Sequence, residues 1–219
     1  MVTVRLTMLC ASAGEGSHVR TFGDGALSAH GRSEITATRT PLPPCTQALR
    51  TPSVRCAQTA EALGVEAVPE DGLRDLDCGV WEGRTFKDVA AEDPFGFSAW
   101  LTDPDAAPHG GESVRRLCRR TAAWLSDLPA DTGHVLVIAE PSVVRAALVH
   151  VLSAPARAFW HLDVPPLAAI TLTLRDGRWN ARLGHLIVPQ QRQLPYGSVS
   201  IAVLPPRTGR GTVCLTGRP

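Results

Sequence analysis

The sequence predicts an α/β fold, a three-layer sandwich with a mostly parallel central sheet and helices on both faces. Short apolar segments rich in β-branched residues alternate with segments whose apolar residues recur every three or four positions. Near the end of this pattern, two strand-like segments are joined by Asp176-Gly177, a dipeptide typical of a hairpin turn. Strands that alternate with helices are typical of a sheet covered on both faces.

The first half of the chain holds one clear strand. Residues 2–10 contain β-branched residues and alternate in part, and they run into a turn of small residues at 11–16. The stretch 23–44 is rich in Gly, Pro, Ser and Thr, so it is expected to be mostly loop. Apolar spacing predicts helices over residues 28–36, 52–63 and 86–91.

The second half is more strongly patterned. Gly111-Glu112-Ser113 opens the clearest helix, over residues 114–128. Four arginines on it, 115, 116, 119 and 120, predict a solvated helix face. A fully apolar strand over 134–139, a helix over 143–152 and a hairpin over 168–174 and 179–183 are expected to follow. Two more strand-like pieces span residues 198–204 and 212–216.

Composition excludes several classes of function. The 219 residues carry 22 basic and 21 acidic side chains, for a net charge of +1, so nucleic acid is not an expected partner. No apolar run reaches the length of a membrane span, and the first residues do not form a signal peptide, which predicts a cytoplasmic protein with no membrane partner. Lys87 is the only lysine, and Ala, Arg, Gly and Pro dominate, which is typical of a GC-rich, actinobacterial-type genome.

The six cysteines indicate neither a metal site nor a disulfide scaffold. No two of them form a Cys-x-x-Cys pair, and they are sparse for a chain of this length. We expect free thiols, no metal and no cofactor.

Four segments in order resemble the histidine phosphatase (phosphoglycerate mutase-like) superfamily. Residues 51–60 (TPSVRCAQTA) are similar to its Ser-Pro-Leu-x-Arg-Ala-x-Gln-Thr-Ala motif, and residues 73–83 (LRDLDCGVWEG) to its Leu-x-Glu-x-x-x-Gly-x-Trp-Glu-Gly motif. Residues 108–113 (PHGGES) and 136–148 resemble two further segments. The resemblance implies one such domain over residues 1–185, followed by a C-terminal extension over 186–219 that is expected to form a hairpin or an extended tail.

The resemblance stops at the catalytic positions. Where the family has Arg-His after its first strand, this chain has Ala11 and Ser12, and Glu140 stands where the family's second histidine follows the later strand. Asp75 occupies the place of the family's catalytic glutamate, and Arg55 matches the family. A phosphohistidine mechanism needs an imidazole nucleophile and a cationic cradle for the phosphoryl oxygens, so we predict that this chain is neither a phosphatase nor a mutase.

The remaining polar residues predict an acid–base site at the carboxyl ends of the strands. The candidate catalytic residues are Glu140, Asp75 and Ser12, because two carboxylates in different surroundings can divide the roles of proton donor and acceptor. Arg55 would hold an anionic group of the substrate. The other candidate substrate-binding residues are Ala11, Glu15, His18, His109 and Ser142.

Each of these residues also has a plainer interpretation. Ser12 would be a small residue left in a loop, Glu140 a partner in a structural ion pair with Arg55, and Asp75 a surface acid. His18 and His109 would be solvated loop histidines. A Ser12–His–Asp75 esterase arrangement is a further alternative.

The favoured function is a repurposed, non-phosphatase enzyme. It would perform isomerisation, cyclisation, dehydration or hydrolysis on a small organic, anionic metabolite, as in secondary-metabolite biosynthesis. The first alternative is an inactive pseudo-phosphatase that binds a small anion or a protein partner, and the second is a weak Ser-dependent hydrolase. An enzyme is expected to enclose an apolar cavity around Glu140, whereas a relic would pair Glu140 with Arg55. A homodimer is a further expectation.

Overall fold

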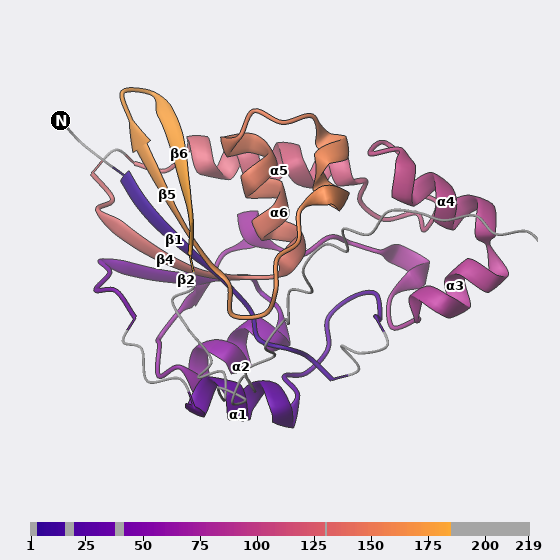
Figure 1. Cartoon of the computed structure of the whole chain (residues 1–219), viewed down its shortest axis with the longest axis horizontal. Coiled ribbons are helices and arrows are strands. Elements are labelled where there is room, and N and C mark those ends of the chain that lie inside the picture. Colours follow the sequence, from indigo (N-terminus) through magenta and orange to yellow (C-terminus); the bar gives the residue numbers. More distant parts are fainter. Residues whose placement is uncertain (1–3, 16–19, 38–41, 130, 185–219) are drawn as a thin grey trace, which may run out of the picture.

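Six strands form one sheet in the order β3-β2-β4-β1-β5-β6, as seen in the computed structural model of the chain (Figure 1). The structure describes residues 4–15, 20–37, 42–129 and 131–184. The strands span β1 Val4–Cys10, β2 Gln47–Arg50, β3 Val68–Pro69, β4 His134–Ala139, β5 Ala169–Arg175 and β6 Arg178–Gly184. Strands β1 to β4 pair in parallel, and the β5–β6 hairpin adds antiparallel strands beside β1. The predicted fold class is confirmed.

Helices cover both faces of this sheet, with α1 and α2 on one face and α5 and α6 on the other (Figure 1). The helices span α1 Ala29–Ala37, α2 Val54–Ala62, α3 Phe86–Glu92, α4 Pro94–Thr102, α5 Val114–Ser126 and α6 Pro141–Val151. Because strand side chains alternate between faces, Leu6 and Met8 of β1 pack toward α6, whereas Leu9 packs toward α1 and α2. The three-layer arrangement follows from this alternation.

The helix starts depend on side chains that accept hydrogen bonds from the first turn. Ser53 and Ser113 accept from the third residue of α2 and α5, so α2 begins at Val54 rather than at residue 52. Helix α6 begins at Pro141, two residues earlier than predicted, because proline at the first helical position needs no amide partner. The sequence did not predict α4. It begins with Pro94 after the capping carboxylate of Asp93, and Gly96 obscures its pattern.

Several expectations fall on the end of the chain. The predicted domain boundary at 185, the extension 186–219 and its strand-like pieces 198–204 and 212–216 lie outside the described residues. Of the cysteines, the five within the described ranges are all free. No helix there is long and apolar enough to cross a membrane.

Candidate active site

A pocket of about 350 Å³ lies at the carboxyl ends of β1 and β4. This is the edge at which sheets of this kind bind ligands. We call it the carboxyl-end pocket. Its lining includes five of the predicted site residues: Ala11, Ser12, Arg55, Asp75 and Ser142. They come from the segment after β1, the first turn of α2, the loop after Leu73 and the first turn of α6.

The other predicted site residues lie elsewhere. Glu140 is completely buried behind the pocket wall, and Glu15 is exposed outside the lining. His109 is also absent from the lining. His18 falls outside the described residues. The predicted site residues near the carboxyl ends of the strands therefore fall into two groups. Some line the pocket, and Glu140 lies buried beneath its wall.

Glu140 forms the centre of that buried layer. Its Oε1 accepts hydrogen bonds from the Ser53 hydroxyl at 2.7 Å and from the Arg55 Nε at 3.3 Å, and its Oε2 pairs with Nη2 of Arg55. Burial disfavours the charged guanidinium, but the adjacent carboxylate raises the pKa of Arg55 above its ordinary value. Burying a carboxylate is costly unless it is paired and hydrogen-bonded, and here the Arg55 cation and the Ser53 hydroxyl fill both needs. The pairing of Glu140 with Arg55 is the one expected of a structural role.

Asp75 is the only predicted carboxylate in the described pocket wall. Its Oδ1 accepts a hydrogen bond from the Leu76 amide at 2.8 Å and another from the Ser142 hydroxyl. Burial, together with the negative charge of Glu140, raises the pKa of Asp75 from 3.8 to about 7. A carboxyl group with this pKa is present in both protonation states near neutral pH, as a general acid or base requires. Both contacts fall on Oδ1, and Oδ2 has no hydrogen-bond partner among the described residues.

Among the described residues, Ser12 has no base beside it. Its hydroxyl donates to the carbonyl of Gly31 at 3.2 Å, and its amide contacts the Thr59 hydroxyl at 3.4 Å. The neighbouring Cys10 is no better as a nucleophile, because burial raises the pKa of its thiol to about 12. The pocket therefore contains a hydroxyl but no described group positioned to activate it.

His109 corrects the interpretation of a solvated loop histidine. Its side chain is buried and lies edge-on to Trp81, with ring centroids 5.0 Å apart. Nδ1 accepts a hydrogen bond from the Gly111 amide at 3.1 Å, and Nε2 has no partner among the described residues. Burial lowers the pKa of His109, so its neutral form is favoured. The aromatic neighbours of this loop could not be identified from local sequence.

Arg120 likewise departs from the expected solvated face of α5. Its side chain is largely buried, and it forms a two-bond pair with Glu112, at 3.1 and 2.7 Å. The same guanidinium donates to the carbonyls of Gly72 and Arg74 at 2.9 Å and of Asp75 at 3.3 Å. Arg120 therefore fixes the backbone of the loop that carries Asp75.

Sequence reasoning missed the apolar and cationic remainder of the pocket. Phe22, Phe86, Trp100 and Phe159 line it, and Arg20 and Arg145 add positive charge. Arg145 lies 5.7 Å from the centre of the Phe159 ring and donates to the Leu162 carbonyl at 2.8 Å. Burial lowers its pKa. An arginine in the first half of the helix 143–152, where its neighbours are all apolar, was the available signal for this residue.

The described residues contain no group of three or more His, Cys, Asp or Glu side chains arranged to hold a metal ion. The polar side chains that line the pocket are instead carboxylate, hydroxyl and guanidinium groups, together with the thiol of Cys78. Burial and the surrounding carboxylates raise the pKa of that thiol far above its ordinary value, so it stays protonated.

Comparison with known proteins assigns the chain to a family. The pattern of the histidine phosphatase superfamily (branch 1) matches residues 14–185. A bifunctional protein of Mycobacterium tuberculosis is 32% identical over 128 residues, 57% of this chain and 35% of that protein. The adenosylcobalamin/alpha-ribazole phosphatase of Salmonella typhimurium is 32% identical over 95 residues, 42% of this chain and 47% of that protein. The chain thus spans about a third to a half of these curated relatives.

Solved structures agree with the sequence match. The mycobacterial glucosyl-3-phosphoglycerate phosphatase superposes with a TM-score of 0.70 at 22% identity, covering 83% of this chain and 98% of that one. A putative alpha-ribazole-5'-P phosphatase of Escherichia coli gives a TM-score of 0.73 at 20% identity, over 83% and 96% of the two chains. At these identities the superpositions establish the fold. The resemblance in the four motifs is confirmed: the chain belongs to the histidine phosphatase superfamily, branch 1.

Proposed function

We propose that this chain is a non-phosphatase enzyme of the histidine phosphatase fold, in which Asp75 acts as a general acid and base on a small organic anion. The observation that carries the proposal is the placement of Asp75 in the pocket wall with its pKa raised to about 7. One oxygen of this carboxyl group is held by Leu76 and Ser142, and the other is left for a substrate.

Phosphohistidine chemistry has no support at this site. Ala11 and Ser12 occupy the positions of the family's arginine and first histidine, and Glu140 occupies that of the second. Glu140 cannot take over the part of a nucleophile, because Arg55 and Ser53 hold it out of the pocket. We instead assign it an indirect role. Its negative charge is, after burial, the second cause that keeps the pKa of Asp75 high.

The pocket lining limits the class of substrate. Arg55 remains partly exposed, with 19% of its side chain accessible, and Arg20 and Arg145 add two further cationic groups. Four aromatic rings, Phe22, Phe86, Trp100 and Phe159, form the apolar part of the lining. A small molecule with an apolar or aromatic body and one carboxylate or phosphate group complements this surface. Isomerisation, cyclisation, dehydration and hydrolysis all remain within the reach of a single proton donor and acceptor.

A second candidate function is binding of the same kind of anion without catalysis. The pairing of Glu140 with Arg55 favours it, because that pairing occupies part of the guanidinium that a phosphate would use. A Ser12-dependent hydrolase has no comparable support, since the Ser12 hydroxyl donates to the Gly31 carbonyl.

A base-sensitive probe separates the two candidates. In 5-nitrobenzisoxazole, a base removes the proton from C3, the C–H electrons form the nitrile, and the N–O bond breaks to release a coloured phenolate. In the protein, the proton would pass to Oδ2 of Asp75. We expect saturable turnover that rises with pH to a plateau, with a midpoint near pH 7.

The variants give this experiment its controls. Asp75→Asn should abolish turnover, whereas Asp127→Asn, which removes an exposed carboxylate beyond the end of α5, should leave it unchanged. Turnover that survives in Asp75→Asn would refute catalysis by this residue. Absence of turnover, with phenylacetate still binding in the pocket by NMR, would leave the binding function in its place.

A phosphatase assay tests the other half of the proposal. No turnover of p-nitrophenyl phosphate above background is expected. Robust hydrolysis that disappears in Arg55→Ala would show that the chain is a phosphatase after all.

A further inference from the structure

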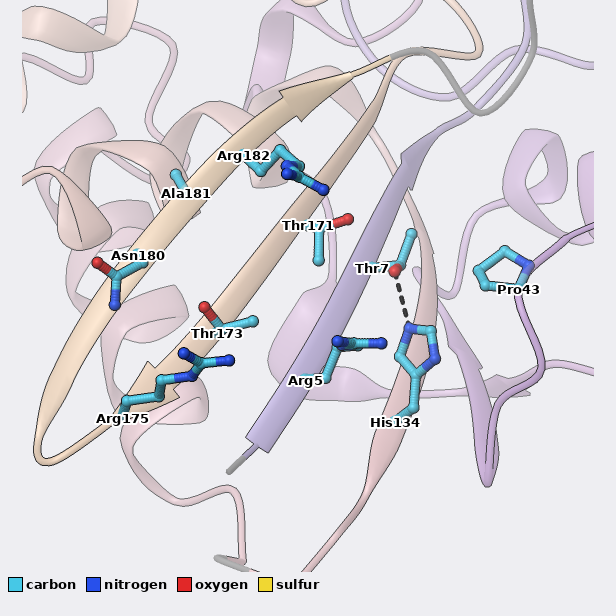
Figure 2. Close-up of a pocket in the computed structure, with 10 residues that line it drawn as sticks. All are labelled: Arg5, Thr7, Pro43, His134, Thr171, Thr173, Arg175, Asn180, Ala181 and Arg182. Atoms are coloured by element: carbon cyan, nitrogen blue, oxygen red, sulfur yellow. Dashed lines mark hydrogen bonds between the residues drawn. The ribbon is translucent and has the colours of Figure 1, made fainter. Parts of the chain in front are cut away.

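A second pocket, of about 510 Å³, lies on the sheet itself at the end opposite the carboxyl-end pocket. We call it the basic pocket, and Figure 2 shows its ten lining residues: Arg5, Thr7, Pro43, His134, Thr171, Thr173, Arg175, Asn180, Ala181 and Arg182. It lies on the face that α1 and α2 cover farther along the strands, near Leu9 and Leu136. None of its lining residues belongs to a helix.

Strand register explains why these side chains share one face. Arg5 lies opposite His134 on one side and Thr173 on the other, and Thr173 lies opposite Asn180. These four residues form one row across β4, β1, β5 and β6. Thr7, Thr171 and Arg182 form the next row on the same face. Because residues directly opposite in a sheet point the same way, the two rows place their polar groups over one surface.

Three guanidinium groups on three strands converge on this surface: those of Arg5, Arg175 and Arg182 (Figure 2). Among the described residues, none of the three has an ion-pair or hydrogen-bond partner. Arg175 also lies directly opposite Arg178 in the hairpin. Like charges in directly opposed positions destabilise a sheet, so this concentration of charge opposes folding.

The segments outside the described residues offer no acidic side chain to neutralise this charge. All 21 Asp and Glu residues are among the described residues, so the segments outside those ranges contain none. Residues 185–219 carry arginines at 192, 207, 210 and 218. That segment therefore supplies no negative charge. Charge complementarity therefore favours an external anion as the occupant.

The hydrogen-bonding groups narrow the class of anion. His134 Nδ1 lies 2.7 Å from the Pro44 carbonyl and must donate to it, so in the neutral ring Nε2 accepts from the Thr7 hydroxyl at 2.8 Å. The hydroxyls of Thr171 and Thr173 remain free to donate to a ligand. The amide nitrogen of Asn180 keeps a second hydrogen beyond its long bond, 3.4 Å, to the Arg178 carbonyl.

The described lining residues include no Phe, Tyr or Trp on which a nucleobase would stack. Guanidinium and hydroxyl groups donate hydrogen bonds that suit phosphoryl oxygens, which need no aromatic ring beside them. The chemistry of the lining therefore favours the phosphoryl part of a ligand over an aromatic part.

We propose that the basic pocket binds a small oligophosphate, organic or inorganic, with at least two phosphoryl groups. Two or more groups fit because Arg182 lies opposite Thr171, four residues along β5 from Arg175, or about 13 Å. A ligand with several phosphoryl groups can meet both guanidinium groups without drawing them together. The volume lies within the usual range for small-ligand sites. This site is separate from the carboxyl-end pocket, so the proposal that it binds a ligand does not depend on the function proposed above.

Calorimetric titration of the full chain with inorganic triphosphate tests the proposal. We expect one site per chain, with binding much tighter than for inorganic phosphate and weakened by added salt. Arg5→Ala and Arg182→Ala should each weaken binding by roughly tenfold, the usual effect of losing one charge-assisted hydrogen bond. Arg157→Ala removes an exposed arginine from the short helical turn Ala156–His161 that follows α6, outside the basic pocket, and should change nothing.

The triple variant Arg5→Ala, Arg175→Ala and Arg182→Ala shows whether weaker binding merely reflects unfolding of the chain. Because it removes clustered like charges, its melting temperature in the absence of ligand should equal or exceed that of the unmodified chain. The proposal is overturned if triphosphate does not bind, or if Arg157→Ala weakens binding as much as the pocket variants do. Preference for a single-stranded oligonucleotide of equal charge would also overturn it, in favour of a nucleic-acid surface.

Discussion

The carboxylate of Glu140 is completely buried and forms an ion pair with Arg55, a residue 85 positions earlier in the chain. This pair joins the first turn of α2 to the end of β4 and forms the floor beneath the carboxyl-end pocket. At this position, where the resemblance implies a histidine in the family, a carboxylate here joins two elements.

Replacing only one member of this ion pair should lower the free energy of unfolding. Arg55→Met leaves a buried carboxylate without its cation, and we expect a loss of about 3 kcal/mol in the free energy of unfolding. The double variant with Glu140→Met should recover most of that loss, because neither charge is then stranded. Urea unfolding measures both. Arg84→Met, in the exposed pair with Glu92, should cost less than about 1 kcal/mol. Equal losses at the two arginines would contradict a structural role for Glu140.

The raised pKa of Asp75 predicts a specific dependence of stability on pH. The folded carboxyl group holds its proton to about pH 7, whereas in the unfolded chain the pKa is near 3.8. The favourable contribution is therefore complete below pH 4 and is lost as the pH rises to 7. Asp75→Asn lacks this loss, so it should be more stable than the unmodified chain at pH 8, by on the order of 2 kcal/mol, but not at pH 4. Melting curves at both values check the sign.

Arg120 is predicted to be a positioning residue for Asp75. Lysine cannot reproduce its five contacts with Glu112 and three backbone carbonyls. Arg120→Lys should therefore lower the maximal rate with 5-nitrobenzisoxazole while the midpoint of the pH profile stays near 7. Arg116→Lys, an exposed neighbour one turn earlier, serves as the control. A merely destabilising effect would change the melting temperature but not the rate measured well below it.

Gly79 is predicted to allow the loop after Asp75 to pack closely against the loop that carries His109. Its φ is +48°, and a Cβ there would lie 2.1 Å from the carbonyl oxygen of His109. Gly79→Ala should cost more than about 2 kcal/mol, from strain and from displacement of that loop. Gly83 has a φ of +76° but open space around it, so Gly83→Ala should cost only about 1 kcal/mol. Comparable losses at both positions would show that the close contact is unimportant.

Most of the fold was accessible from sequence because its signals are local. The three-four rhythm of α5, the apolar run of β4 and the Asp176-Gly177 turn each determine one element without help from distant residues. Helix α4 was missed because its proline and glycine carry the signature of a loop.

The site was only partly predictable, for a different reason. Motif order places Arg55, Asp75 and Ser142 at one edge, and the structure brings them into one pocket. The direction of the Glu140 side chain depends on Ser53 and Arg55, far away in sequence, so no local pattern could assign it to the core. The same holds for His109, whose burial against Trp81 is decided by packing between two loops.

Strand β1 links the two pockets, because it carries Thr7 of the basic pocket and runs directly into Ala11 of the carboxyl-end pocket. At about 3.3 Å per residue these positions are about 13 Å apart. Hydrogen bonds to β4 on one side and β5 on the other keep the strand from sliding. The strand is thus a rigid spacer. Two ligands seated at its ends would neither collide nor compete, and the affinity measured for either should be the same whether or not the other is present.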